Sequence, residues 1–218
     1  MILLRAPEDS AGKERMTMDK KTPLTLSANN SVLLLIDYQA VMLYGVESGD
    51  RTLIQNNVQA LAKGAQILGI STVLTSIGEK RNGLFLAEIR EMFPKIPVIA
   101  RKVPGFDCFD DQEVLNAVKQ TGKKQLVLSG LWTSMCFAFT AIRGVKEGFE
   151  VFGVMDTAGS ESPVAHNTAI QRMIQAGIVP CTWMQVISEW MNNWGNPKAG
   201  ELVEKVYSKY SGFFAQKL

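Results

Sequence analysis

The sequence predicts a three-layer α/β/α domain of the Rossmann-like class, built on a six-stranded parallel sheet. Short apolar segments alternate six times with segments whose apolar residues recur at helical spacing. The first apolar segment, SVLLLIDY at 31–38, is continuous up to Asp37, which is typical of a strand buried on both faces. Because crossovers between parallel strands are nearly always right-handed, we expect helices on both faces of the sheet.

The expected elements follow in order along the chain. Strands are expected at 31–38, 71–76, 97–102, 125–130, 150–156 and 178–183. Helices are expected at 51–68, 84–93, 111–122, from about Cys136 onward, at 162–177, 184–191 and 201–210, with 78–83 as a loop. Gly69 and Pro94 are natural helix ends, and Asp110 or Asp111 is a suitable cap. Ser162 followed by Pro163 is a typical helix start.

The length of 218 residues predicts one main domain. We assign it to residues 31–195, because residues 1–30 are polar and lack periodicity, and are therefore expected to form a loose N-terminal arm. Residues 196–218 are expected to form a C-terminal helical tail. Met16 and Met18 are alternative start sites to Met1.

The composition limits the classes of partner. Basic residues number 23 and acidic residues 21, giving a net charge of +2 without a basic stripe, so nucleic acid is not an expected partner. No apolar run approaches the roughly 18 residues that span a membrane, and no signal peptide is recognisable. The three cysteines show no CxxC spacing, which favours neither a disulfide framework nor a zinc site. We therefore expect a cytoplasmic protein.

Three chemically suitable side chains follow predicted strands. Asp37 ends the first strand, Lys102 the third, and Cys136 lies just beyond the fourth in the stretch QLVLSGLWTSMCFAFTAIRG. The carboxyl ends of parallel strands form one edge, where ligands of such folds bind. A thiol at this edge could attack a carbonyl carbon, while the carboxylate accepts the thiol proton and the ammonium group stabilises the negative charge. A helix start at Cys136 would also favour the thiolate.

Each of these residues also has a structural interpretation. Cys136, flanked by apolar residues, could be a small buried hydrophobic residue. Asp37 could cap a loop or bind a metal or a ribose, and Lys102 could be a solvated strand end. Their common position at one sheet edge is what favours a shared site.

Three ordered motifs carry a resemblance to a known family. LLLIDYQ at 33–39, IARKVPGFDCF at 99–109 and LSGLWTSMCFAFTAIRGVKEGFEVFGVMDTAGS at 128–160 resemble the isochorismatase-like cysteine hydrolases, most closely the YcaC-type branch. The resemblance runs from about residue 31 to 190. It implies the isochorismatase-like hydrolase fold and hydrolysis of a small amide, carbamoyl or other C–N substrate through a cysteine thioester.

The resemblance also implies the site. The catalytic triad would be Asp37 as general base, Lys102 as electrostatic support and Cys136 as nucleophile. A cis peptide between Leu131 and Trp132 would turn the Trp132 N–H beside the Cys136 N–H, so that these two donors form an oxyanion hole. Pocket walls are expected from residues near the three motifs: Tyr38, Gln39, Phe106, Trp132 and Thr133.

Departures from the superfamily narrow the activity. Nicotinamidases of the superfamily bind a metal through an Asp-x-His pattern and a further histidine, whereas the only histidine here is His166, expected in a helix after the fifth strand. We therefore expect no metal and no other cofactor, and a surface or helix-packing role for His166. Isochorismatases proper act on a vinyl ether and lack the cysteine, so Cys136 also argues against that reaction.

Two other functions compete with the hydrolase. A non-enzymatic oligomeric or binding protein could retain the pocket, in which case the Cys136 thiol would be inert. A dinucleotide-dependent oxidoreductase is disfavoured, because IDYQAVMLYG stands where a G-x-G-x-x-G motif would follow the first strand. The resemblance further implies a homo-oligomer, a tetramer or an octamer, acting on a small molecule.

Overall fold

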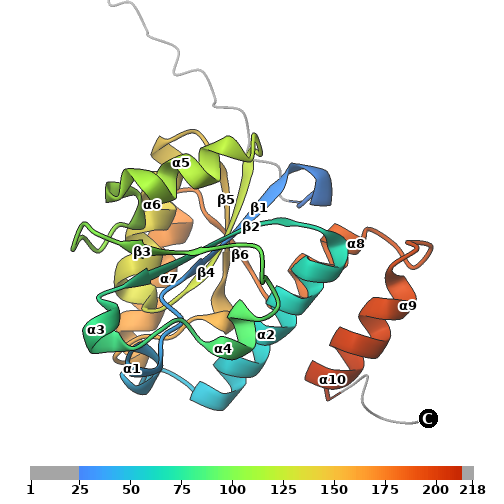
Figure 1. The fold of residues 1–218 in the computed structure, drawn as a ribbon, viewed down its shortest axis with the longest axis horizontal. Coiled ribbons are helices and arrows are strands. Elements are labelled where there is room, and N and C mark those ends of the chain that lie inside the picture. Colours follow the sequence, from blue (N-terminus) through green and yellow to red (C-terminus); the bar gives the residue numbers. More distant parts are fainter. Residues whose placement is uncertain (1–24, 213–218) are drawn as a thin grey trace, which may run out of the picture.

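The structure, a computed structural model, describes residues 25–212 and has the predicted three-layer α/β/α fold (Figure 1). Six parallel strands lie in the order β3-β2-β1-β4-β5-β6. Their bounds are β1 Ser31–Ile36, β2 Ser71–Ile77, β3 Val98–Arg101, β4 Gln125–Gly130, β5 Glu150–Val154 and β6 Val179–Cys181. The predicted six-stranded parallel sheet is thereby confirmed.

Helices cover both faces of the sheet (Figure 1). The bounds of the longer ones are α2 Arg51–Leu68, α5 Gln112–Gln120, α6 Ala138–Lys146, α7 Pro163–Gln175 and α8 Trp183–Met191. The shorter helices and helical turns are η1 Ala28–Asn30, α1 Ala40–Tyr44, α3 Glu79–Asn82, α4 Ala87–Arg90, η2 Cys108–Asp110, η3 Thr133–Phe137, η4 Met155–Thr157, α9 Ala199–Leu202, η5 Val203–Tyr207 and α10 Ser208–Tyr210.

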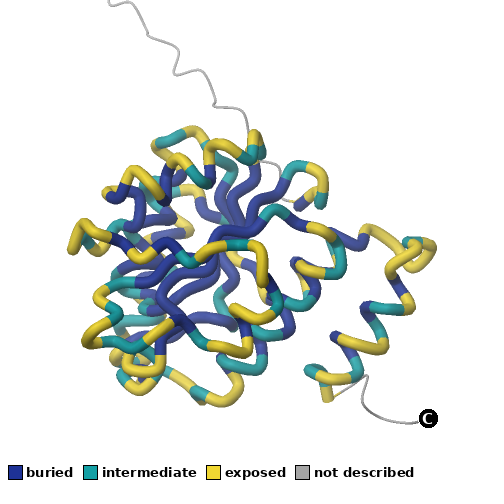
Figure 2. Tube along the Cα trace, in the orientation of Figure 1, coloured by how far each residue is buried: buried dark blue, intermediate teal, exposed yellow. Residues whose placement is uncertain are grey.

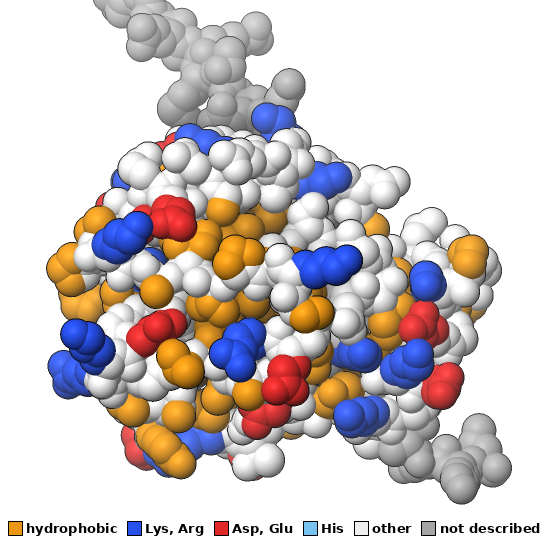
Figure 3. All heavy atoms as spheres, in the orientation of Figure 1, with side chains coloured by type: hydrophobic (Ala, Val, Ile, Leu, Met, Phe, Trp, Pro, Cys, Tyr) orange, Lys and Arg blue, Asp and Glu red, His pale blue; other side chains and the backbone are white. Residues whose placement is uncertain are grey.

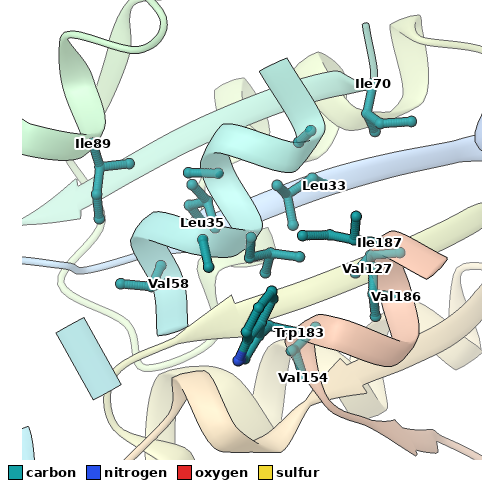
Figure 4. Close-up of a cluster of buried hydrophobic side chains, with 14 of the residues drawn as sticks. Leu33, Leu35, Val58, Ile70, Ile89, Val127, Val154, Trp183, Val186 and Ile187 are labelled. Carbon is teal, nitrogen blue, oxygen red and sulfur yellow. The ribbon is translucent and has the colours of Figure 1, made fainter. Parts of the chain in front are cut away.

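The core forms two layers because successive strand residues point to opposite faces of the sheet. Leu33 and Leu35 of β1 pack under α2 and α8, where Val58 and Ile187 meet them (Figure 4). Leu34, between them in sequence, belongs to the layer under α5, α6 and α7. The central strands are therefore buried throughout, while the helices expose their outer sides (Figure 2).

Several predicted helix ends are confirmed by their hydrogen bonds. The Ser162 side chain accepts from the Ala165 N–H, and Pro163 occupies the first turn of α7. Asp111, not Asp110, caps α5, and Gly69 ends α2 in the left-handed region at φ 68°.

The segment 78–93 differs from its prediction. Residues 84–93 were expected to form one helix, but α4 covers only Ala87–Arg90. The residues before it are extended, because Phe85 bridges to Gln39 and the Leu86 N–H donates to the Tyr38 carbonyl. Residues 79–82, expected in a loop, form the short helix α3.

Both predicted terminal segments lie partly outside the described residues. Of the N-terminal arm, residues 1–24 are not described, whereas the Leu26 N–H donates to Glu189 at 2.6 Å. Of the C-terminal tail, residues 213–218 are not described, and α9 to α10 pack on α2 with Leu202 and Val206 in the core. The domain boundaries at 30 and 195 stay predictions.

The direction of the chain changes between β1 and β4. The chain runs from β1 outward through β2 to β3, and from β4 outward through β5 to β6, so the carboxyl ends of the central pair border a crevice. Ligands bind at such a point in open α/β sheets. Asp37 follows β1, and the segment leading to Cys136 follows β4.

Two features relate to the expected partners: the distribution of charge on the surface, and the length and hydropathy of the helices. Lys and Arg side chains are mixed with Asp and Glu on the face seen in Figure 3. None of the helices within residues 25–212 is both long and apolar enough to cross a bilayer.

Candidate active site

Asp37 is a buried carboxylate in an unusual backbone conformation. It has φ 56°, in the left-handed region that residues other than glycine seldom adopt, directly after the last residue of β1. Its N–H donates to the Thr75 carbonyl at 2.9 Å, and its side chain is fully buried. The fold therefore fixes a carboxylate at the crevice.

Arg101 is the cation that pairs with Asp37. Its Nη2 lies 2.6 Å from Asp37 Oδ2 and 3.9 Å from Cys136 Sγ, and both members of the ion pair have fully buried side chains. One guanidinium nitrogen therefore faces both the carboxylate and the thiol. Asp37 Oδ1 has no hydrogen-bond partner within residues 25–212.

Lys102 lies outside this site, and its predicted place in the triad must be corrected. Its Nζ forms an ion pair with Glu113 at 3.3 Å, and its side chain is 81% exposed. The cause is the period of two along β3, since Ile99 and Arg101 point inward whereas Ala100 and Lys102 point outward. Counting this alternation forward from Ile99 would have identified Arg101.

Cys136 lies in η3, a π-helical turn of Thr133–Phe137 between β4 and α6. Such turns are rare and often occur at functional sites. Cys136 is 5% exposed, and its thiol borders a cavity described below. The helix expected to start at Cys136 instead begins as α6 at Ala138.

The pKa of the Cys136 thiol is high, whereas a helix start at this residue was expected to lower it. Burial and the neighbouring Asp37 carboxylate raise the pKa of Cys136 to about 12, against the opposing effect of Arg101. Burial also raises the pKa of Asp37 to about 6, although Arg101 and the Cys136 thiol oppose this shift. At neutral pH the resting site therefore holds a thiol beside a carboxylate.

The turn before Cys136 contains the predicted cis peptide between Leu131 and Trp132. The Leu131 N–H donates to the Ile36 carbonyl at 3.1 Å, and the Thr133 N–H donates to the Gly159 carbonyl at 2.8 Å. The Trp132 N–H, between them, has no acceptor in the part of the chain that is described. It is therefore an available donor on the segment that carries Cys136.

A cavity of about 490 Å³ opens at this edge of the sheet. Its walls come from α1, the segment after β2, the loop after β3 and the turn of Cys136. The lining residues are Val41, Met42, Gly45, Ile77, Arg81, Asn82, Pro104, Gly105, Phe106, Trp132, Met135 and Cys136. This size suits a small molecule.

Trp132 is held firmly in the cavity wall. Its indole Nε1–H donates to the Met42 carbonyl at 2.7 Å. Gly45 lies against the adjoining edge of the six-membered ring, where an added Cβ would stand 2.2 Å from Trp132 Cζ2. A glycine is therefore required at position 45 for the indole to keep this position.

Two of the five predicted pocket residues, Phe106 and Trp132, line the cavity. Tyr38 does not, because its hydroxyl is buried against Ser129 Oγ at 2.6 Å and the Thr157 carbonyl at 2.7 Å. Gln39 is also buried and binds the backbone of the segment after β2. Thr133 is buried and contacts His166. For these three residues the prediction of a pocket-lining role is wrong.

Two further residues complete the surroundings. Cys108 Sγ accepts a hydrogen bond from Arg101 Nη1, so the guanidinium group lies between two sulfur atoms. The motif at 99–109 contains Cys108, but the sequence assigned this residue no role. The half-buried His166 bonds to Thr133 through Nδ1, 2.8 Å from Thr133 Oγ1, and burial lowers the pKa of its imidazole. This packing position on α7 agrees with the role expected for His166.

Among residues 25–212, no three His, Cys, Asp or Glu side chains lie together as a possible set of metal ligands.

The arrangement resembles known proteins. The protein-family model described as the isochorismatase domain matches residues 31–185 of the sequence. The probable hydrolase YcaC of Escherichia coli K12 is 37% identical over 182 residues, covering 83% of this chain and 86% of YcaC.

Two solved structures show the same fold at substantial identity. YcaC from Pseudomonas aeruginosa, solved with hexane-2,5-diol and covalent acrylamide, has a TM-score of 0.83 at 35% identity, covering 88% of this chain and 94% of that one. The YcaC gene product of Escherichia coli, described as an octameric hydrolase of unknown specificity, has a TM-score of 0.83 at 35% identity, covering 88% and 93%. With a family model matched over residues 31–185 and YcaC related over most of both chains, this chain belongs to the isochorismatase family of hydrolases.

Proposed function

We propose that this hydrolase cleaves a C–N bond of a small amide or carbamoyl compound through a thioester on Cys136, without a metal. The observation that carries the proposal is the buried cluster of Asp37, Arg101 and Cys136, in which Cys136 lines a cavity of small-molecule size. Lys102, which the sequence placed in this cluster, has no part in the proposal.

In the first step Cys136 Sγ attacks the carbonyl carbon while its proton moves to Asp37. The pKa values support transfer during attack rather than a preformed thiolate, because Asp37 is ionised at neutral pH and the thiol is not. Asp37 Oδ1 is the suitable acceptor, since Oδ2 is engaged by Arg101. The C–N bond then breaks, and the leaving nitrogen takes the proton from Asp37.

The second step is hydrolysis of the thioester. Water attacks the acyl carbon and gives a proton to Asp37, the C–S bond breaks, and this proton returns to the Cys136 sulfur. Asp37 therefore serves as base and acid in turn, and the acid product leaves with the oxygen of water.

The developing oxyanion needs hydrogen-bond donors. The Trp132 N–H is available, and we assign it together with the Cys136 N–H to this role. Loss of one such donor typically costs about 3 kcal/mol of transition-state stabilisation.

We further propose that the chain forms a homo-oligomer. The octameric state described for the Escherichia coli relative supports this, as do the exposed apolar side chains of Tyr44, Val164 and Trp194. The cytoplasmic location stays a prediction from the sequence.

The test uses the purified full chain and a panel of small primary amides and carbamoyl compounds. Ammonia release is measured together with the mass of the intact protein, in the wild type, in Cys136→Ala and in Cys181→Ala. Cys181 is a matched control, because it is a buried free thiol at the far edge of the sheet.

We expect ammonia release and an acyl adduct on Cys136 in the wild type and in Cys181→Ala, and neither in Cys136→Ala. Ammonia release from Cys136→Ala at the wild-type rate would show that the proposed nucleophile is wrong.

A further inference from the structure

The cavity lined by Cys136 has a single charged side chain in its wall. Arg81 is the one charged side chain among its lining residues, and apart from the Asn82 amide and Cys136 thiol the other side chains are apolar. The second arginine of the region, Arg101, does not add to this charge, because its buried partner Asp37 compensates it at 2.6 Å. The side chains that line the cavity therefore carry a net positive charge, which comes from Arg81.

Arg81 is not compensated by a neighbouring acid. It takes part in no ion pair within residues 25–212, unlike Arg51 or Arg143, which pair with Glu47 and Glu147. Glu79, two residues earlier, accepts from Ser76 Oγ at 2.8 Å and borders a separate cavity beside Phe93. The Arg81 guanidinium group is available to an external anion.

The backbone that carries Arg81 is tied to the segment that carries the proposed base. The Arg81 N–H donates to the Gly78 carbonyl at 2.8 Å, and the Asn82 amide donates to the Ile77 carbonyl at 2.9 Å. Gln39, two residues after Asp37, accepts from the Ile77 N–H at 3.0 Å and donates to the Gly83 carbonyl. The segment that carries Arg81 is therefore held by hydrogen bonds to Gln39, close in sequence to Asp37.

We propose that the substrate is an amide or carbamoyl compound that also carries a carboxylate, which Arg81 binds while the scissile carbonyl lies at Cys136. A guanidinium group recognises carboxylates with two parallel hydrogen bonds and gains nothing comparable from a neutral amide. The part of the substrate between the two groups packs against Trp132 and Phe106. This inference rests on the proposed function for the reacting group, whereas its test measures anion recognition alone.

The test follows covalent labelling of Cys136 by two maleimides of similar size. N-carboxyethylmaleimide carries a carboxylate, and N-propylmaleimide is neutral. The labelling rates are measured by mass spectrometry with peptide mapping, in the wild type, Arg81→Gln, Arg81→Lys and Lys80→Gln. Lys80 is the matched control, because it lies next to Arg81 in α3 and is exposed but does not line the cavity.

The measured quantity is the ratio of the two rates, in which changes in Cys136 reactivity cancel. We expect Arg81→Gln to lower this ratio about three- to fivefold, the upper part of the range of one partly solvated ion pair, and Lys80→Gln to leave it unchanged. Arg81→Lys should keep part of the preference. An unchanged ratio in Arg81→Gln, or an equal fall in Lys80→Gln, overturns the inference.

A second measurement covers the case in which neither maleimide reaches Cys136. Ligand-detected NMR with benzoate and benzamide reports binding without any reaction. A benzoate signal that falls in Arg81→Gln, with the benzamide signal retained, supports the inference, and an unaltered benzoate signal overturns it. If Cys136→Ala hydrolyses amides normally while the Arg81 effect persists, the proposed function fails and anion recognition stands.

Discussion

Replacing Arg101 and Lys102 in parallel separates the buried cation from the exposed one. Arg101→Met removes the partner of a fully buried carboxylate, whose other oxygen already lacks a hydrogen bond in the described structure. Removing one member of a buried ion pair typically costs about 3–5 kcal/mol, because an uncompensated charge remains. Lys102→Met removes a pair whose side chains are 81% and 57% exposed, and such pairs contribute less than about 1 kcal/mol.

The expected difference is large enough to measure by urea or thermal unfolding. A loss of about 3–5 kcal/mol corresponds to a fall in Tm of roughly 6–20 °C for a domain of this size. Without Arg101 the pKa of Asp37 should rise further, since the attraction that opposes its protonation is lost. The folded variant then binds a proton more tightly than the unfolded chain, so its stability deficit should be full at about pH 8 and smaller at about pH 5.5.

The rate of amide hydrolysis should also distinguish the Arg101 variant from the Lys102 variant. Arg101→Met should lose most of its amide hydrolysis because Asp37 is protonated or displaced, whereas Lys102→Met should keep the wild-type kcat/KM. Arg101→Lys keeps the charge and serves as the comparison if Arg101→Met folds poorly. If Arg101→Met were as stable and active as Lys102→Met, the assignment of the site cation would be refuted.

Three further changes test the site. Asp37→Asn should lower the pKa of the Cys136 thiol, because the carboxylate that raises it is gone while Arg101 remains; thiol absorbance against pH measures this, and an unchanged pKa would contradict the coupling. In the wild type, kcat/KM should rise with pH through about 6, because Asp37 accepts a proton only when ionised; a profile flat from pH 5 to 8 would exclude it as the base. Gly45→Val should displace the Trp132 indole and lower kcat/KM at least about tenfold, with a shift in tryptophan fluorescence; normal kinetics would show that the indole position is unimportant.

The fold could be predicted because its signals are repeated along the chain. Continuous apolar strands, helical spacing and caps such as Ser162 each indicate the same layered architecture. The helix expected at 84–93 was wrong because its apolar residues are satisfied by tertiary contacts, with Phe85 bridging Gln39 across 46 positions of the sequence numbering. Local spacing does not contain such a partner.

For the proposed site, the sequence led to Asp37 and Cys136, but it led to Lys102 in place of the neighbouring buried cation Arg101. Asp37 and Cys136 follow buried central strands, whose ends are clear in the sequence. At the edge strand β3 the sequence offers two adjacent cations, and only the strand register decides which side chain points inward. Arg81 could not be identified from the sequence, because its proposed role in binding depends on a cavity formed by four separate segments.

The charge balance of the buried cluster explains why a thiol with a raised pKa is compatible with catalysis. Between pH values of about 6 and 12, Asp37 and Cys136 together hold one proton and one negative charge, and Arg101 supplies one positive charge. The buried group is then neutral overall, so the resting site avoids the cost of an excess buried charge. In the proposed mechanism, attack on a carbonyl would move the proton to Asp37 and the negative charge to the substrate oxygen, without changing this total. A cluster with a preformed thiolate beside ionised Asp37 would instead carry two negative charges against one guanidinium group. This charge balance is the reason that we propose proton transfer during attack, with the Trp132 N–H as the proposed donor to the oxygen that then carries the negative charge.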